Sequence, residues 1–428
     1  MRLVYDAPLP QRPFQRAREI DVDDKLVAVV LGDIPVRLWG LTPAERIERQ
    51  LRVEGLHVWH KRVDTLPAEA RVLVLRGDCL YDARALRGLI KIGQAVLEAD
   101  IQGHCVPVAA HVRADQVAAV AAWLECGSRP SFAADIATVT LDEIAKSYDA
   151  GLKKLDRPFV LLVTAERRLA LERLTFSGAY KGVTDLVTKW LWPVPAQWVT
   201  RWCVAMGITP NQVTFASLVL VVIAGVLFAR GAFAWGLVAG WIMTFLDTVD
   251  GKLARVTVTS TKFGNVFDHG IDLIHPPLWY LAWGMGLALW PPAIAVVPLS
   301  LVYAVILIGY VGGRLCEGAF QLFIARFSIF TWRPFDSWFR LIGARRNPNM
   351  ILLTVSLALG RPDLGLLAVA VWTALSTALL LLRLLLAALA KWQRKAIRSW
   401  LSEIGQTVDE HDLTVRVFAH SASTARKA

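Results

Sequence analysis

Cysteine is scarce in this 428-residue sequence, and no two cysteines lie close together. The odd number and the absence of a Cys-X-X-Cys pair argue against a disulfide framework and are typical of reduced residues in a protein that faces the cytosol. A secretory signal is also lacking, because the first 25 residues are polar and contain proline. We therefore expect the N-terminal part to stay on the cytoplasmic side. The five cysteines are Cys79, Cys105, Cys126, Cys203 and Cys316.

Acidic residues are outnumbered by basic ones, 36 to 47, which gives a formal net charge of +11. This sign of charge can indicate nucleic-acid binding, but the rest of the composition favours another interpretation. Hydrophobic residues make up 55% of the chain, its mean hydropathy is +0.44, and it contains 17 tryptophans. Membrane proteins carry excess Lys and Arg in cytoplasmic loops and place Trp at the interface. We therefore expect a membrane protein of more than one domain, with no nucleic-acid partner.

The most informative stretch reads DTVDGKLAR, then eight residues, then GNVFDHGID. Asp247 and Asp250 share one helix face, and Asp268 and Asp272 share another. Each pair adjoins a long apolar run, which places four carboxylates at the edge of a membrane, where ionisable groups are usually functional. Oxygen-only ligand sets suit Mg²⁺, Mn²⁺ or Ca²⁺, which would hold the carboxylates together. The alternative is a pair of helix ends capped by solvated aspartates.

Eight positions in this stretch resemble, without a gap, the signature of the CDP-alcohol phosphotransferases. The resemblance extends over about residues 181–391 and implies a homodimeric, all-α membrane domain of six helices. It also implies transfer of a phosphoryl-alcohol group from a CDP-alcohol donor to an acceptor hydroxyl, with release of CMP and with two Mg²⁺ or Mn²⁺ ions. The eight positions are Asp247, Asp250, Gly251, Ala254, Arg255, Gly264, Asp268 and Asp272.

The same resemblance implies a role for each matched residue. Asp247, Asp250 and Asp268 would be metal ligands, while Asp272 would be the general base and would also touch the second metal. The nucleotide would be bound by Asn211, Asp247, Gly251, Ala254, Arg255 and Gly264.

Three polar residues near the signature have two interpretations each. Asn211, in the sequence TPNQVT, either helps to hold the CDP moiety or belongs to a simple helix cap. Lys262 either contacts the acceptor or is a surface lysine at the membrane edge. Arg314 either binds the polar head of the acceptor or pairs with Glu317.

Residues 1–165 predict a soluble α/β domain. Helical patterns at Pro43–Glu54 and Ala83–Ala99 fall between short apolar runs, and this alternation favours a largely parallel sheet. The runs that we interpret as buried strands are Leu26–Leu31, Arg71–Leu75, Cys105–His111 and Phe159–Val163.

This N-terminal region resembles the sugar-nucleotide type of nucleotidyltransferase, with an eroded active pattern. Arg37 fits the end of the triphosphate-binding loop, but Pro35 stands where a glycine is expected and has no backbone amide to offer. Asp78 fits a metal-binding aspartate, and Asp135 is kept where the second acidic residue has become Ala137. We therefore expect a non-catalytic scaffold or a regulatory domain. An active domain would instead make the CDP-alcohol that the membrane domain consumes.

The remaining chain predicts a linker, a set of membrane segments and a tail. Residues 166–208 are rich in Trp and basic residues, which is typical of an amphipathic helix on a membrane surface. Residues 391–428 form a basic tail. Lys and Arg gather in alternate loops, so the positive-inside rule places both termini and the aspartates on the cytoplasmic side of the inner membrane. The apolar segments lie near 211–229, 232–254, 267–290, 293–315, 348–360 and 364–388.

Three functions remain open from the sequence. The favoured one is a phospholipid-synthesis enzyme that uses CDP-diacylglycerol and a small polar alcohol or its phosphate. The second is transfer from a soluble CDP-alcohol to a lipid or polyol phosphate. The third is a non-enzymatic membrane transporter or scaffold, since transporters also carry carboxylates inside the membrane. The intact signature argues against the third.

Overall fold

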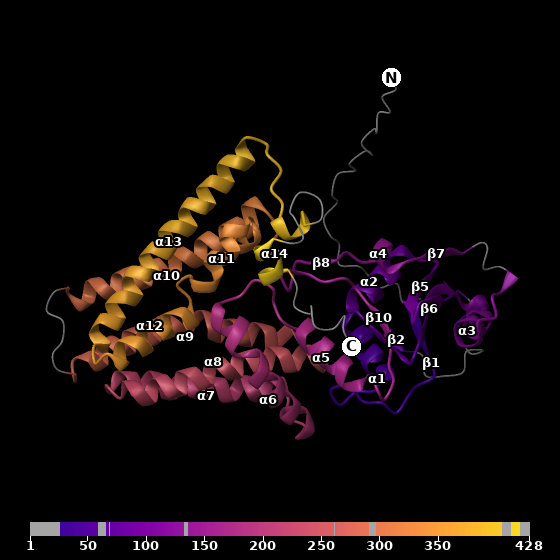
Figure 1. The fold of residues 1–428 in the computed structure, drawn as a ribbon, viewed down its shortest axis with the longest axis horizontal. Coiled ribbons are helices and arrows are strands. Elements are labelled where there is room, and N and C mark those ends of the chain that lie inside the picture. Colours follow the sequence, from indigo (N-terminus) through magenta and orange to yellow (C-terminus); the bar gives the residue numbers. More distant parts are fainter. Residues whose placement is uncertain are drawn as a thin grey trace.

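The computed structural model contains an N-terminal α/β unit and a helical unit that lie side by side (Figure 1). It describes residues 26–58, 66–67, 69–131, 136–260, 262–290, 297–404 and 412–419. The division agrees with the predicted order of an α/β region followed by helices.

The central sheet of the N-terminal unit is mixed, not largely parallel as predicted. β1 (Leu26–Leu31) is parallel to β2 (His57–Val58) and β3 (Arg71–Arg76). β6 (His104–Arg113), however, is antiparallel to both of its neighbours, β3 and β5 (Ala95–Ile101).

A tight turn explains the difference. Gln102 and Gly103 join β5 to β6 with φ angles of 57° and 86°, and two left-handed residues in succession form the type of turn that closes an antiparallel hairpin. The full strand order is β2-β1-β3-β6-β5-β7, with β7 (Ala137–Val139) parallel to β5.

Two other predictions in this unit need correction. The pattern at Ala83–Ala99 is not one helix, because α2 (Ala83–Ile92) ends at Gly93, whose φ of 80° cannot continue a helix, and the chain then enters β5. The apolar run Phe159–Val163 forms β10 (Val160–Leu162), which pairs with β4 (Cys79–Tyr81) and not with the main sheet.

The other helices of this unit lie where the sequence directs them. α1 (Pro43–Val53) begins with a capping box, in which Thr42 accepts a hydrogen bond from the backbone of Glu45 and the Glu45 side chain accepts one from the backbone of Thr42. The unit is completed by α3 (Val117–Cys126), α4 (Leu141–Ile144), β8 (Tyr148–Asp149) and β9 (Lys154–Leu155).

A helix occupies each of the six apolar segments predicted downstream. Three helices of the described chain are long and apolar enough to cross a membrane, namely Pro210–Ala229, Leu299–Ile324 and Pro362–Trp392. The crossing of all six segments stays a prediction. The helices are α7 (Pro210–Ala229), α8 (Phe233–Val256), α9 (Lys262–Leu287), α10 (Leu299–Ala319), α12 (Arg346–Ala358) and α13 (Pro362–Trp392).

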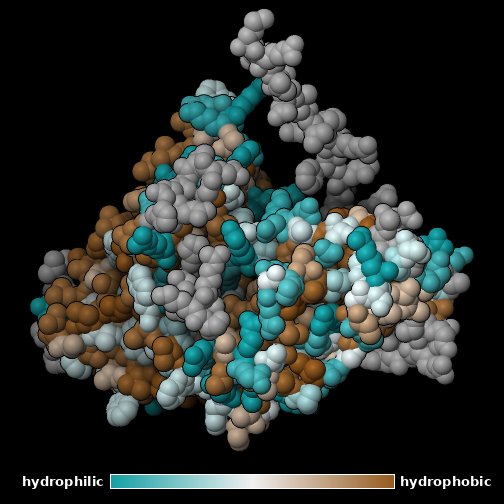
Figure 2. Space-filling model, turned by 45° about the vertical axis from the view of Figure 1, so that its right-hand side comes forward, coloured by the Kyte–Doolittle hydropathy of each residue, from teal (hydrophilic) through white to brown (hydrophobic). Residues whose placement is uncertain are grey.

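Apolar side chains cover much of the helical unit on the face shown in Figure 2, whereas the N-terminal unit has a mixed surface. The linker contains α5 (Arg168–Gly178) and α6 (Pro193–Ala205), and on α6 the side chains of Trp198 and Trp202 are 73% and 57% exposed. Such exposed rings fit the predicted position along a membrane surface.

Parts of the predicted tail are packed into the protein. Trp400 is buried and donates its indole N–H to the hydroxyl of Ser337 at 2.9 Å, in α11 (Pro334–Ile342). Phe418, in α14 (Leu413–Phe418), is also buried, and it packs edge-on against Trp338. Burial of these aromatic side chains removes large apolar areas from water, and this stabilises the packed position of the segment despite its basic residues.

The N-terminal unit is fixed to the C-terminal end of α8. Trp39 is 2% exposed and stacks on Phe176 with ring centroids 5.5 Å apart. Arg46 donates to the carbonyl of Val256 at 2.6 Å, and Arg49 donates to that of Thr257 at 2.9 Å. Cationic side chains at carbonyls that end a helix are favourable, so two arginines of α1 cap α8.

Candidate active site

The guanidinium of Arg346 lies between two aspartates of the signature. Its Nη2 donates to Oδ2 of Asp247 in α8 at 2.6 Å, and its Nη1 donates to Oδ1 of Asp272 in α9 at 2.5 Å. Arg346 is the first residue of α12, so three helices meet at this point. The structure thus brings Asp247 and Asp272 to one common position, as the signature predicts.

Asp250 is buried one turn further along α8 and has a different neighbour. Its Oδ2 accepts a hydrogen bond of 2.6 Å from the hydroxyl of Thr214 in α7. The adjacent Gly251 leaves little room, since a Cβ there would lie 3.0 Å from Nη2 of Arg255. The described contacts therefore join Asp250 to α7, while Asp247 turns towards α9 and α12.

The linker crosses the end of the signature on α8. Arg255 donates from Nε to the carbonyl of Ala179 at 2.9 Å, and the ammonium of Lys252 lies 3.7 Å from the ring centroid of Tyr180. Further along, the amide of Asn347 donates to Asp185 at 2.9 Å. Residues 179–185 thus connect the C-terminal end of α8 with the beginning of α12.

The remaining predicted residues are described by their positions along the helices. Asn211 is exposed in the first turn of α7, where Thr209 forms the helix cap with Gln212, and Ala254 lies on α8. Gly264 lies in the first turn of α9. The side chains of Lys262 and Asp268, both on α9, lie outside the described residues, and so does the whole of Asp135.

The predicted residues of the N-terminal domain are engaged in local pairs. Arg37 is exposed and donates to the carbonyl of Gly40 at 2.8 Å and to Glu45 at 3.2 Å. Asp78 accepts two hydrogen bonds from Arg76, at 3.0 and 2.7 Å. Burial raises the pKa of Asp78, but Arg76 outweighs it and holds the pKa below its usual value. Neither contact supports a triphosphate or metal site here.

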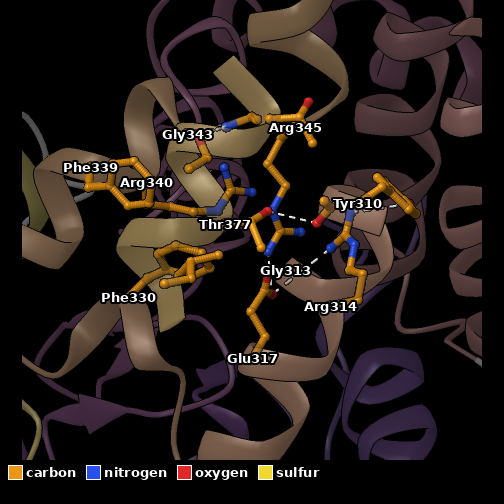
Figure 3. Close-up of a pocket in the computed structure, with 15 residues that line it drawn as sticks. Tyr310, Gly313, Arg314, Glu317, Phe330, Phe339, Arg340, Gly343, Arg345 and Thr377 are labelled. Atoms are coloured by element: carbon orange, nitrogen blue, oxygen red, sulfur yellow. Dashed lines mark hydrogen bonds and ion pairs between the residues drawn. The ribbon is translucent and has the colours of Figure 1, made fainter. Parts of the chain in front are cut away.

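A cationic cavity, which we call the arginine pocket, lies beside the aspartates and is lined by Arg314, Arg340 and Arg345 (Figure 3). It contains about 380 Å³ of space not filled by atoms, part of it open to solvent. Arg345 pairs with Glu317, and Arg314 lies 3.9 Å from the same carboxylate. Nη1 of Arg340 is buried and has no hydrogen-bond partner among the described residues.

Tyr310 connects the arginine pocket to Asp272. Its hydroxyl donates to the carbonyls of Leu273 at 2.9 Å and Asp272 at 3.4 Å, and it accepts a hydrogen bond of 3.4 Å from Arg314. The neighbours Arg345 and Arg346 diverge, with one side chain at the pocket and the other at the aspartates. The hydroxyl of Tyr310 thus links the pocket to the backbone of Asp272.

Sequence reasoning missed the roles of Arg340, Arg345 and Arg346. In the sequence they count only among the basic loop residues that predict the cytoplasmic side. The available signal was the consecutive Arg345–Arg346 pair directly before the Asn-Pro start of a helix. Arg314 lines the pocket, which is compatible with binding of the acceptor. It also lies near Glu317, as the pairing interpretation expects.

The structure brings together two of the carboxylates that the signature implies as metal ligands. Asp247 and Asp272 both face one cationic group, and carboxylate oxygens are the ligands that Mg²⁺ prefers. Within the described residues, however, no three His, Cys, Asp or Glu side chains form a group that could hold a metal. The Asp268 side chain, which the signature adds to the set, lies outside those residues.

The comparisons with known proteins concern the helical unit. Phosphatidylinositol phosphate synthase of Mycobacteroides abscessus is 36% identical over 87 residues, which cover 19% of this chain and 40% of that protein. Archaetidylinositol phosphate synthase of Pyrococcus horikoshii is 33% identical over 79 residues, which cover 18% of this chain and 42% of that protein. Phosphatidylinositol phosphate synthase of Mycolicibacterium smegmatis is 29% identical over 119 residues, covering 27% of this chain and 54% of that protein.

The matched stretch thus spans between two fifths and about half of the length of these relatives. Residues 207–316 match the family described as CDP-alcohol phosphatidyltransferase, and all eight signature positions fall inside this range. The chain therefore carries, in residues 207–316, a domain of the CDP-alcohol phosphatidyltransferase family.

Proposed function

We propose that this membrane transferase of phospholipid synthesis moves a phosphatidyl group from CDP-diacylglycerol to the hydroxyl of a phosphorylated polar alcohol, and releases CMP. The choice of acceptor rests on the arginine pocket next to Asp272. In this pocket Nη1 of Arg340 is buried and has no hydrogen-bond partner among the described residues. Guanidinium groups bind phosphate through charge-assisted hydrogen bonds. The names of the relatives, which are phosphatidylinositol and archaetidylinositol phosphate synthases, support the same choice.

In this proposal Asp272 accepts the proton of the acceptor hydroxyl. An acceptor with its phosphate in the arginine pocket would lie beside Asp272, because Tyr310 joins the two sites. A base at this place depends on position more than on basicity, since nearby cations lower the basicity of a carboxylate. Arg346 would hold the Asp272 carboxylate in orientation until substrates bind.

The donor nucleotide would lie along the cytoplasmic end of α8. Gly251 and Ala254 are small residues on this end of the helix, and Arg255 would supply charge for the phosphates. Asn211 and Gly264 would complete this site from α7 and α9. Lys262, at the start of α9, would add positive charge on the acceptor side.

Members of the family are generally dependent on divalent metals. In this chain Asp247, Asp250, Asp268 and Asp272 would hold two Mg²⁺ or Mn²⁺ ions, which when bound would neutralise the charge of the diphosphate and of the leaving CMP. The protein residues themselves orient the substrates, exclude competing water and accept the proton.

The membrane arrangement is part of the proposal. The six helices α7, α8, α9, α10, α12 and α13 would span the inner membrane, with both termini cytoplasmic and with α6 on the surface. The N-terminal unit would be a non-catalytic scaffold that caps α8, because the contacts of Arg37 and Asp78 are local ones. A homodimer is expected from the family resemblance.

The test is release of CMP by the purified protein with Mg²⁺ or Mn²⁺. CDP-diacylglycerol would be offered with inositol phosphate, glycerol phosphate, inositol or serine as acceptor. We expect turnover with a phosphorylated acceptor and none with the unphosphorylated ones. Turnover with serine or inositol alone would overturn the choice of acceptor. Turnover with only a soluble CDP-alcohol would overturn the choice of donor, and no CMP release from any donor would favour a transporter or scaffold.

A further inference from the structure

The segment of residues 345–346, whose arginines reach the arginine pocket and the aspartates, is held on both sides. Before it, the amide of Ala344 donates to the hydroxyl of Ser376 in α13 at 3.0 Å. After it, the side-chain amide of Asn347 donates to Oδ1 of Asp185 in the linker at 2.9 Å. The N-terminus of α12 has no side-chain cap of its own. The directions of the two arginines therefore depend on contacts with other parts of the chain.

Asp185 has the surroundings of an anchor. It is 7% exposed, and its carboxylate accepts hydrogen bonds from the backbone amide of Thr188 at 3.0 Å and from the hydroxyl of Thr188 at 2.9 Å, besides that from Asn347. Burial raises the pKa of Asp185, but the charge of Arg340 and these hydrogen bonds outweigh it and hold the pKa below its usual value. An ionised carboxylate only accepts, so Asn347 has to present its nitrogen.

Asn347 is a costly residue for a position that would serve packing alone. It is 4% exposed, and its Oδ1 is buried without a hydrogen-bond partner among the described residues. A buried polar atom that lacks a partner lowers stability. The nitrogen, which bonds to Asp185 and lies 3.3 Å from the hydroxyl of Thr188, is therefore what this side chain contributes.

Asp185 also has a local role that must be separated from this one. The amides of Thr188 and Lys189 donate to its side chain and to its carbonyl, both at 3.0 Å, which is the arrangement of a helix cap at the start of the short helix η4 (Val187–Leu191). Removal of Asn347 leaves this cap intact. Asn347 is thus the position that distinguishes a link to α12 from a local cap.

We propose that Asp185 and Asn347 are positioning residues of the acceptor site, which hold one arginine in the arginine pocket and the next one between the two aspartates. The inference rests on the proposed function and deepens it, because these arginines belong to the site proposed for the acceptor and the base. Both positioning residues lie outside residues 207–316, which match the family. A loosened link would impair acceptor binding and the orientation of Asp272, but not binding of the donor along α8.

The first experiment uses Asn347→Ala, which removes the link and keeps the cap. We expect the KM for inositol phosphate to rise about tenfold and kcat to fall about tenfold, while the KM for CDP-diacylglycerol stays within about twofold. The matched control is Asp363→Ala, which removes a buried aspartate paired with Arg361 at 2.9 Å, near the opposite end of α12. Both KM values of this control should stay within about twofold.

Variants of Asp185 test whether the hydrogen bond carries the effect. Asparagine is an equally good helix cap, and in Asp185→Asn the amide of Asn347 can turn to accept a hydrogen bond with its unpaired oxygen. This variant should keep all three kinetic constants within about threefold. Asp185→Ala should resemble Asn347→Ala, and the double variant should be no worse than either, because both changes break one contact.

Four outcomes would overturn the inference. The first is an unchanged acceptor KM in Asn347→Ala, and the second is a loss of kcat alone in that variant, which indicates fewer folded molecules. The third is an Asp185→Asn as impaired as Asp185→Ala, and the fourth is a double variant in which the two effects multiply. If Asp185→Ala does not fold, Asn347→Ala decides.

A second readout separates this inference from the proposed function. Inorganic phosphate should raise the thermal unfolding midpoint of the wild type and of Asp363→Ala, but much less that of Asn347→Ala. This measurement needs no turnover. If no acceptor supports CMP release and the phosphate response still depends on Asn347, the proposed reaction fails while the positioning role stands. An equal phosphate response in all three proteins, or none in any of them, would overturn the role.

Discussion

Replacement of Arg346 by Gln removes the cation that separates two carboxylates of the signature. Glutamine keeps a polar side chain, but it is shorter and uncharged and cannot neutralise Asp247 or Asp272. In the wild type both ion pairs are within 2.6 Å, and the side chain of Arg346 is 14% exposed. Loss of one partner of a buried ion pair costs about 3–5 kcal/mol, because it leaves an uncompensated charge.

The exposure of the two partners decides where in this range the variant falls. The side chain of Asp247 is only 18% exposed, whereas that of Asp272 is 40% exposed and partly screened by solvent. The loss should therefore come mainly from Asp247, and we expect the free energy of unfolding to fall by about 3 kcal/mol in EDTA. Mg²⁺ should restore more than half of this loss, because it supplies the missing positive charge.

The assay is denaturant unfolding of the purified protein in detergent, with EDTA or with Mg²⁺. The matched control is Arg383→Gln, which breaks the buried pair between Arg383 and Asp336, at 2.6 and 2.8 Å, away from the signature. That variant should be destabilised without a larger response to Mg²⁺ than the wild type shows. Equal stability of Arg346→Gln and wild type in EDTA, or an equal Mg²⁺ response in both variants, would refute the reasoning.

Three further predictions concern single residues. Asp272→Asn should abolish CMP release but leave binding of the CDP donor within about threefold, and a variant that retains most of its turnover would exclude Asp272 as the base. Arg340→Gln should raise the acceptor KM by about tenfold or more, as measured by CMP release, and an unchanged KM would place the phosphate elsewhere. Arg46→Met should leave the carbonyl of Val256 unsatisfied, cost about 1–3 kcal/mol, and speed proteolysis of the linker relative to Arg52→Met, an exposed arginine of the same helix.

The sequence predicted those parts of the site that depend on regular helix spacing. Asp247 and Asp272 have positions on α8 and α9 that follow from the period of a helix, and the signature predicts that they lie together, as their shared contact with Arg346 shows. The strand Leu26–Leu31 and the helix that begins at Pro43 were also foreseen, because local sequence patterns determine both elements. A capping box marks the start of the helix.

Features that depend on tertiary contacts were not foreseen. The opposite directions of Arg345 and Arg346 follow from which charges lie nearby, and no local pattern encodes that. The antiparallel β6 depends on the left-handed turn at Gln102 and Gly103, and glutamine is not a usual turn signal. The burial of Phe418 depends on β8, β9 and α11, which are far away in the sequence.

The most direct test of the account is to identify the lipid that forms when the purified protein, CDP-diacylglycerol, Mg²⁺ and inositol phosphate are combined. Mass spectrometry would follow the product, and CMP would be measured in parallel. The account predicts a phosphatidyl product that keeps the phosphate of the acceptor, in an amount equal to the CMP, and lost in Asp272→Asn. A product without that phosphate, or CMP release without any new lipid, would contradict transfer to a phosphorylated alcohol.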